Sequence, residues 1–210
     1  TSNRIILNPA FKSERKKIEA ANPGISEKEL TSKMYQYYIK GYYRLVKSVD
    51  DNVGRVLDYL KESGLEKNTI VIYTSDQGFA LGEHGFYNKQ WMYEEPLHAP
   101  FLVKFPGTIK AGQVHNSMTS HVDIAPTILD FAGAAIPEDM QGFSLKPILL
   151  GKKEKVRDAS YYHFYEHGVR LPEMIGIRTD RHKLIFYPGM KGQYRWELFD
   201  LEKDSQEMKN

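Results

Sequence analysis

Apolar residues recur every three or four positions over residues 30–60, the spacing of one face of an amphipathic helix. The set is Leu30, Met34, Tyr37, Tyr38, Leu45, Val49, Val53, Val56, Leu57 and Leu60. Ser26 with Glu29 three residues later is the signature of a capping box, and Gly64 follows the pattern as a C-cap. We therefore predict a long helix here, which Gly41 could divide.

Two continuous apolar runs have the composition of strands. Residues 69–76, TIVIYTSD, are rich in β-branched side chains, and residues 101–105, FLVKF, form a second run. Runs without alternation are typical of strands buried on both faces of a parallel sheet. Because a helical pattern precedes the first run, this part of the chain resembles half of a βαβ unit, and the predicted fold class is α/β.

Shorter helical patterns follow the strands. Asp123 is placed to cap a helix over residues 124–132, which Gly133 would end. Residues 144–150 predict one or two further helical turns. Residues 1–24 show no such pattern, and we expect an irregular segment there.

The pattern changes after residue 156, where short aromatic and β-branched segments alternate with turns. The segments are ASYYHFYE, MIGIRT, KLIFY and RWELFD, and a hairpin-like TDRH joins the second to the third. This favours an antiparallel meander. We expect a boundary near Gly151, giving one domain over residues 1–151 and a small antiparallel domain over residues 152–210.

Composition narrows the classes of partner. The 210 residues carry 29 basic and 27 acidic side chains and no cysteine. The missing cysteine excludes disulfides, zinc–thiolate sites and a cysteine nucleophile within these residues. Basic clusters at residues 12–17 and 152–157 are interrupted by Glu and predict solvated faces, so neither a nucleic-acid nor a membrane partner is expected. No apolar stretch approaches the ~20 residues of a membrane span, and the first residues lack the layout of a signal peptide.

The loop after the first predicted strand combines polar side chains with three glycines. Asp76 and Gln77 follow the strand directly, where ligands of α/β sheets bind. A carboxylate beside an amide carbonyl offers hard oxygen ligands that suit Ca²⁺ or Mg²⁺. Lys89, twelve residues beyond Gln77, can reach an oxyanion held by that metal, and His84 can donate to the same anion or to a sugar hydroxyl.

Structural explanations remain open for each of these residues. Asp76 is also a turn former, Lys89 a surface lysine and His84 a hydrogen-bonding residue of a loop. His121 and Asp123 are expected to be a helix cap and its neighbour. Residues expected in the core are Trp91, Tyr93 and Trp196. For His163, in a tyrosine-rich strand, binding of a sugar and packing within a hairpin are equally open.

Several motifs in order give a resemblance to a known family. Residues 69–107, TIVIYTSDQGFALGEHGFYNKQWMYEEPLHAPFLVKFPG, are similar to the second metal-ligand segment of the type I sulfatases of the alkaline phosphatase superfamily. The other motifs are VDDNVGRVLDYLKESG, SHVDIAPTILDFAG, GFSLKPILLG, IRTDRHKLIFY and WELFDLEKDSQEMKN. Within the family, the chain most resembles bacterial enzymes that act on sulfated glycans, including those similar to N-acetylglucosamine-6-sulfatase.

The resemblance implies roles for the loop residues. Asp76 and Gln77 would be two ligands of a calcium ion, and Lys89 would be the catalytic lysine that contacts the substrate sulfate. His84 would lie at the rim of the active site, among the substrate-binding residues. The implied fold is the C-terminal part of an alkaline-phosphatase-like α/β sandwich, followed by a small antiparallel domain.

The family's nucleophile is a formylglycine made from C-x-P-x-R or S-x-P-x-R, and neither motif occurs in these 210 residues. The Asp50-Asp51 pair lies within the predicted helix and cannot replace the family's early metal-binding pair. We therefore expect the chain to be the C-terminal portion of a sulfatase, inactive alone and completed by an N-terminal half that carries the formylglycine. The resemblance implies a sulfated carbohydrate substrate and a periplasmic or secreted location.

Two other classes of function stay open. A phosphoester or phosphonate hydrolase of the same superfamily would use a similar site, because fold does not fix function. A metal-dependent glycan-binding module without catalysis would use the same metal and sugar contacts.

Overall fold

The computed structural model describes residues 9–165, 171–189 and 194–210. Contacts divide the chain into two compact units. The first unit combines Thr1–Thr69 with Phe79–Asn88, and the second combines Ile70–Gly78 with Lys89–Asn210. The predicted boundary near Gly151 lies inside the second unit and stays a prediction.

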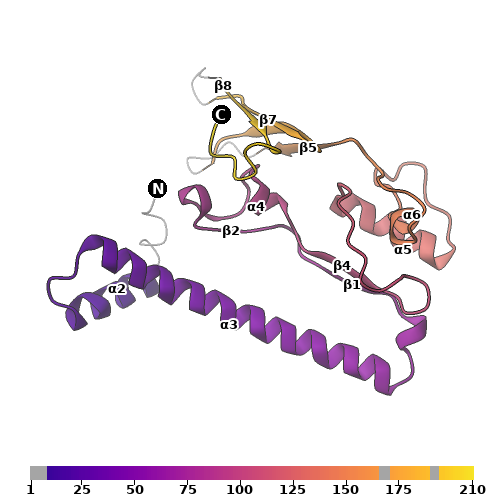
Figure 1. The fold of residues 1–210 in the computed structure, drawn as a ribbon, viewed down its shortest axis with the longest axis horizontal. Coiled ribbons are helices and arrows are strands. Elements are labelled where there is room, and N and C mark those ends of the chain that lie inside the picture. Colours follow the sequence, from indigo (N-terminus) through magenta and orange to yellow (C-terminus); the bar gives the residue numbers. More distant parts are fainter. Residues whose placement is uncertain (1–8, 166–170, 190–193) are drawn as a thin grey trace. The chain divides into compact units, whose positions relative to one another are not determined.

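The first unit contains two helices, α2 (Pro9–Ala21) and α3 (Glu27–Glu62), which lie side by side in Figure 1. The expectation of an irregular segment over residues 1–24 is wrong for α2. Its sequence is rich in Lys, Arg, Glu and Ala, which are strong helix formers even without a clear apolar period. The Phe11 ring packs 5.8 Å from those of Tyr37 and Tyr38, which fixes α2 against α3.

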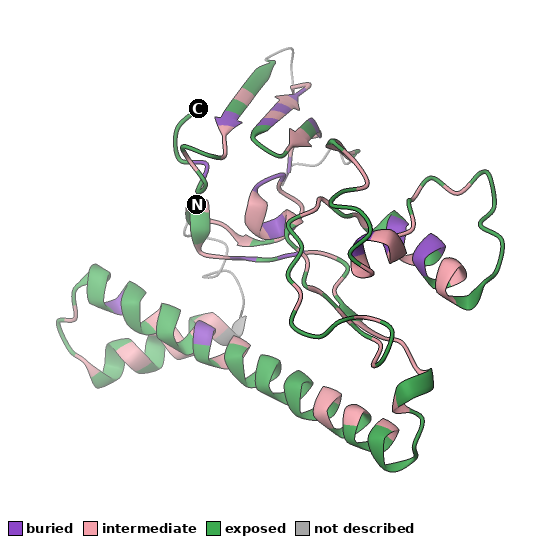
Figure 2. Ribbon diagram, turned by 45° about the vertical axis from the view of Figure 1, so that its right-hand side comes forward, coloured by how far each residue is buried: buried purple, intermediate pink, exposed green. Residues whose placement is uncertain are grey.

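The prediction of a long helix is confirmed in α3. Ser26 and Glu29 form the complete capping box, and Gly64 takes a φ of +73° just beyond the helix. Gly41 does not divide the helix. Of the ten residues of the predicted apolar face, Leu30 is buried, five are half-buried and four are exposed, with Leu45 69% exposed. Figure 2 shows that exposed residues prevail along α3 as a whole.

The rest of the first unit is short. A 3₁₀ turn, η1 (Glu66–Asn68), follows α3. The strands β2 (Ala80–Leu81) and β3 (Tyr87–Asn88) then pair antiparallel around a second turn, η2 (Glu83–Gly85).

The second unit begins with β1 (Val71–Thr74) and β4 (Phe101–Lys104), which pair antiparallel with Val71 opposite Lys104. The sequence predicted strands of a parallel sheet, but these two strands pair antiparallel, because an apolar run does not record the direction of pairing. The expectation of strands buried on both faces is also wrong in the part described. Leu102 is 60% exposed, and β1 and β4 form a sheet of two strands.

The helical predictions of the second unit are largely confirmed. Its short elements are α4 (Glu94–Leu97), η3 (His121–Asp123), α5 (Ile124–Ala132) and α6 (Lys146–Leu149). Gly133 ends α5 with a φ of +70°, and Gly151 follows α6 with a φ of +68°. No helix of the described chain is both long and apolar enough to cross a membrane.

The prediction that Asp123 caps α5 with its side chain is wrong. Asp123 stands at the start of α5, but its side chain makes no capping hydrogen bond to that helix and is fully buried. Its carboxylate accepts hydrogen bonds from the N–H groups of Ser120 and Phe143 at 2.8 and 2.9 Å. The guanidinium group of Arg157 donates two further hydrogen bonds to this carboxylate, at 2.6 and 2.5 Å. Arg157 is therefore an exception to the solvated basic cluster predicted over residues 152–157.

The predicted antiparallel meander is confirmed. The strands β5 (Ala159–Phe164), β6 (Met174–Thr179), β7 (His182–Tyr187) and β8 (Arg195–Asp200) pair in chain order. The hairpin between β6 and β7 pairs Arg178 with Lys183.

One face of this sheet forms much of the core of the second unit. Met174 and Ile185 are fully buried there, together with Phe199. Tyr93 is buried as predicted, whereas Trp196 is 57% exposed, so its assignment to the core is wrong. Trp196 stacks on Phe186, its partner in the register, with ring centres 4.2 Å apart.

Candidate functional site

The turn after β1 places the two predicted metal ligands. Asp76 is exposed and Gln77 is half-buried, and both line the same cleft. Among the described residues, Asp76 makes no ion pair, and the hydroxyl of Ser75 lies 3.3 Å from one of its oxygens. The donor set of one carboxylate and one amide carbonyl fits a hard divalent cation.

Gly78 closes this turn against α4. Its N–H donates to the carbonyl of Pro96 at 2.8 Å. A Cβ atom on Gly78 would lie 1.9 Å from the carbonyl oxygen of Glu95, so no larger residue fits without movement of the backbone. The close approach that this glycine permits is to the chain itself.

His121 supports the same turn from the other side. Its Nε2 lies 2.5 Å from the carbonyl oxygen of Ser75, directly before Asp76. The turn η3, which carries His121, is held by the ion pair between the buried Asp123 and the half-buried Arg157. The sequence indicated a structural role for His121 but contains no signal for this contact, because 46 residues separate the two partners.

Lys89 begins the segment between β3 and α4. The lysine is half-buried, and among the described residues it makes no ion pair. The next residue, Gln90, has a φ of +83°, and its carbonyl accepts a hydrogen bond of 2.7 Å from the hydroxyl of Tyr162 on β5. Two residues further, Met92 is 1% exposed and packs over Gly176 of β6, where a Cβ would lie 2.1 Å from the methionine sulfur.

A cluster of charges ties α4 to the C-terminal sheet. Glu94 accepts two hydrogen bonds from Arg178 at 3.1 and 3.0 Å and pairs with the Nζ of Lys183 at 2.7 Å. Lys183 also lies 2.7 Å from Glu207 in the C-terminal segment, and both of these side chains are buried. Burial acts to raise the pKa of Glu94, but Arg178 and Lys183 outweigh it and lower the pKa to about 2.

The second unit contains a cleft of about 1620 Å³. It is bordered by the turn after β1, the segment before α4, the turn η3 and strand β5. The predicted site residues that line it are Asp76, Gln77 and His163, together with His121 and Gln90. Lys89 precedes Gln90 but is not among the lining residues.

His163 is held within the sheet by three neighbours. Its Nε2 lies 2.9 Å from Glu173, and its Nδ1 lies 3.2 Å from the hydroxyl of Tyr161. The ring stacks on Tyr165 with centres 3.6 Å apart. This arrangement gives His163 a packing role in the described chain, and its binding of a sugar stays a prediction.

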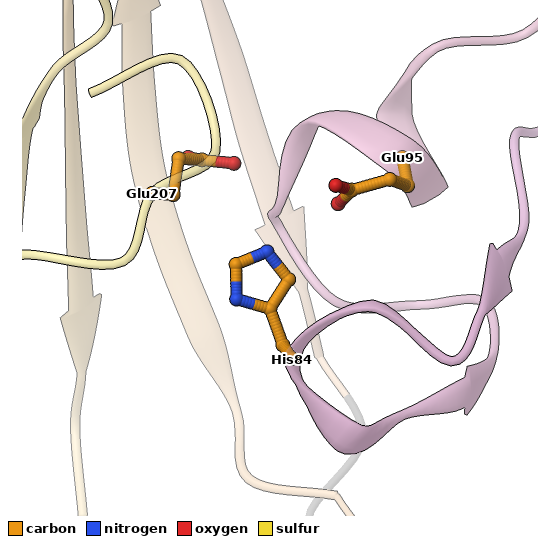
Figure 3. Close-up of side chains that lie close together, drawn as sticks. All are labelled: His84, Glu95 and Glu207. Carbon is orange, nitrogen blue, oxygen red and sulfur yellow. The ribbon is translucent and has the colours of Figure 1, made fainter. Parts of the chain in front are cut away.

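His84 belongs to the first unit, in η2, with a φ of +52°. Figure 3 shows its ring, together with Glu95 on α4 and Glu207 in the C-terminal segment, which belong to the second unit. Since these side chains come from two units, we derive no metal site from them. The role predicted for His84 at the rim of the site stays a prediction.

Two family models match the chain. The Sulfatase model matches residues 9–134, and the model "N-sulphoglucosamine sulphohydrolase, C-terminal" matches residues 82–210. Together they cover the turn after β1, Lys89 and the C-terminal sheet.

Similar proteins agree with the models. The chain is 45% identical over 189 residues to an N-acetylglucosamine-6-O-sulfatase of Bacteroides thetaiotaomicron, covering 87% of the chain and 33% of that protein. It is 34% identical over 172 residues to an arylsulfatase of Clostridium perfringens, covering 80% of the chain and 34% of that protein. The chain thus spans about a third of the length of these relatives.

A solved structure, BT4656 in complex with its substrate D-glucosamine-2-N,6-O-disulfate, superposes with a TM-score of 0.85 at 43% identity. The match covers 92% of this chain and 40% of that one. The phosphonate monoester hydrolase of Agrobacterium radiobacter superposes with a TM-score of 0.70 at 29% identity, over 80% of this chain and 36% of that one. The predicted likeness to the C-terminal part of the sulfatase fold is confirmed, and the chain belongs to the sulfatase family.

Proposed function

We propose that the complete protein is a sulfuric ester hydrolase that removes sulfate from a sulfated glycan. The observation that carries the proposal is the pair Asp76 and Gln77 at the end of β1, inside the region that the Sulfatase model matches. Two oxygen ligands in sequence supply a metal site, and Lys89 at the start of the next segment, with no ion pair among the described residues, supplies a cation for an anionic substrate.

Sulfatases generally use a divalent metal and a formylglycine. In our proposal, Asp76 and Gln77 hold a calcium ion through a carboxylate oxygen and an amide oxygen. Further ligands and the formylglycine come from the N-terminal part of the protein, which we propose as the partner of this chain. When bound, these groups supply the nucleophile and neutralise charge on the sulfuryl oxygens.

Lys89 acts on the substrate directly in this proposal. Its ammonium group is a compact charge on a flexible stem, suited to a tetrahedral anion. Because the charge on the sulfuryl oxygens shifts as the ester bond breaks, a fixed cation stabilises the transition state electrostatically. His84 contacts the sugar at the rim, and His163 contacts it from β5.

We propose a substrate with a 6-O-sulfated glucosamine unit. Support comes from the relative named as an N-acetylglucosamine-6-O-sulfatase and from the solved complex with a disulfated glucosamine. We further propose a periplasmic or secreted location, which suits an enzyme that meets extracellular glycans. A similar protein of Drosophila melanogaster is named as an extracellular sulfatase.

The test is turnover of a 6-O-sulfated glucosamine by the complete protein and by its Lys89→Ala variant. We expect kcat/KM to fall by at least ~10²-fold, comparable to the loss of one oxyanion donor. The control is Lys110→Ala, which removes an exposed lysine with no ion pair in the described chain. Wild-type turnover in Lys89→Ala would contradict the role of Lys89.

The same assay separates sulfate ester hydrolysis from phosphonate hydrolysis. The likeness to the Agrobacterium enzyme makes phosphonate hydrolysis the alternative to test. Matched aryl esters of sulfate and of a phosphonate are compared at equal concentration. Faster release of sulfate supports the proposal. Faster hydrolysis of the phosphonate, or binding of the glycan with no turnover of either ester, would overturn it.

A further inference from the structure

We propose that Tyr162 is a positioning residue for Lys89, because its hydroxyl fixes the backbone of the residue that follows the lysine. The inference rests on the role proposed above for Lys89. It gives Tyr162 a part in catalysis without contact to the substrate.

The segment that carries Lys89 has little structure of its own. Between the end of β3 at Asn88 and the start of α4 at Glu94, the chain forms neither helix nor strand. Local hydrogen bonds therefore do not set the direction of the lysine side chain. Contacts with other elements must do so.

The backbone at Gln90 is strained. A φ of +83° is rare for a residue with a Cβ, and it persists only where the surroundings determine it. The contact that restrains this peptide is the 2.7 Å hydrogen bond from the Tyr162 hydroxyl to the Gln90 carbonyl. Strain at a residue next to a catalytic group is characteristic of a backbone held for function.

Tyr162 is suited to hold this bond. The residue lies within β5, paired with Gly176 of β6, so its backbone is fixed by the sheet. Burial raises the pKa of the Tyr162 hydroxyl, which therefore remains a protonated donor at neutral pH. Its partner is a carbonyl, which can only accept.

The following residues anchor the segment to the same sheet. Met92 packs over Gly176, and the hydroxyl of Tyr93 lies 3.2 Å from Glu197 of β8. Since these anchors lie two and three residues beyond Gln90, the Tyr162 contact is the nearest to Lys89 of these three contacts with the C-terminal sheet. It is therefore the contact whose loss should most disturb the lysine.

The test is Tyr162→Phe in the complete protein, which removes the hydroxyl and keeps the ring. We expect kcat/KM for the sulfated sugar to fall by about tenfold, because small displacements of catalytic groups have effects of this size or larger. Thr179→Val is the matched control, since it removes a hydroxyl that donates a 3.1 Å hydrogen bond to a backbone carbonyl, that of His182, on the same sheet. We expect its kcat/KM to stay within about twofold of wild type, because it leaves the Gln90 carbonyl bonded.

A double-mutant cycle separates positioning from a general loss of structure. If Tyr162 acts through Lys89, Tyr162→Phe should cause no further loss when Lys89 is already alanine. Hydrogen exchange of the amides of residues 89–92 gives a readout independent of activity, and we expect faster exchange in Tyr162→Phe than in Thr179→Val.

The outcomes are distinguishable. Wild-type activity in Lys89→Ala would overturn the proposed function itself. If Lys89→Ala is impaired, wild-type activity of Tyr162→Phe, or losses that multiply in the double variant, would overturn the inference alone. Should Tyr162→Phe fail to fold, Gln90→Gly frees the same strained position, and we expect a severalfold lower kcat/KM without a lower Tm. Unchanged kcat/KM in that variant would also overturn the inference.

Discussion

At the scale of single residues, the candidate site depends on close contacts as much as on its chemical groups. Gly78 lets the turn after β1 touch the backbone of α4, and His121 holds the Ser75 carbonyl from η3. Asp76 and Gln77 lie between these two contacts. Their positions are therefore fixed by the contacts of the residues on either side of them.

Gly78→Ala should strongly destabilise the protein. The new Cβ would meet the carbonyl oxygen of Glu95 at 1.9 Å, so the turn or α4 must move. We expect a loss of about 1–3 kcal/mol, the usual cost of overpacking, measured by urea unfolding of the complete protein. Gly41→Ala is a control without this clash, because Gly41 lies within helix α3 and no heavy atom lies within 4 Å of its Cβ position. Equal stability of Gly78→Ala and wild type would contradict the contact.

At the scale of elements, sequence patterns predicted those held by local signals. The capping box of α3, the glycines after α5 and α6, and the meander from β5 to β8 appear where the patterns indicated. The antiparallel pairing of β1 with β4 was not predictable, because an apolar run does not record its partner. Helix α2 was missed because its propensity is high but its apolar period is weak.

The candidate site likewise combines residues that local sequence predicts with contacts that it does not predict. The positions of Asp76 and Gln77 after a strand follow from local sequence. The contacts that orient the site join residues far apart in the chain, such as Tyr162 with Gln90 and Arg178 with Glu94. No local pattern encodes such pairs, so the sequence could not predict them.

The tie between α4 and the C-terminal sheet makes stability depend on pH. Since the folded pKa of Glu94, about 2, lies below its ordinary value of 4.5, its ionisation stabilises the fold above that value. This contribution is lost as the pH falls from 4.5 towards 2. Burial raises the pKa of Glu207, which also faces Lys183. Its contribution has the opposite sign and is lost as the pH rises above its ordinary value of 4.5, outside the acid window of Glu94.

We therefore expect Glu94→Gln to flatten the acid side of the stability profile. Urea unfolding of the complete protein between about pH 3 and pH 6 measures it, and wild type should lose more stability on acidification than the variant. At pH 6 the variant should be the less stable protein, because Arg178 and Lys183 then face a neutral amide. Parallel profiles for the two proteins would show that the cluster does not stabilise the fold through its charge.

At the scale of the whole molecule, the chain spans about a third of the length of its relatives. Some of its apolar side chains are exposed, as expected where the rest of a longer protein would cover them. Exposed apolar side chains in the described chain include Leu45 and Val56 of α3 and Leu102 of β4. In the complete protein, the metal would join this chain to the part that supplies the remaining ligands. Binding of the metal should then stabilise the whole fold and not only the turn after β1.

Calcium should accordingly raise the Tm of the complete protein, because a ligand that binds only the folded state stabilises it by about 2.7 kcal/mol at one hundred times its Kd. A chelator should reverse the shift. Asp76→Ala should reduce the shift strongly, since it removes the only charge of the proposed ligand pair in this chain. Asp139→Ala, which removes an exposed aspartate with no ion pair in the described chain, should keep it. Thermal unfolding with and without calcium measures all three proteins without reference to activity. A full calcium shift in Asp76→Ala would place the metal elsewhere and remove the basis of the site proposed here.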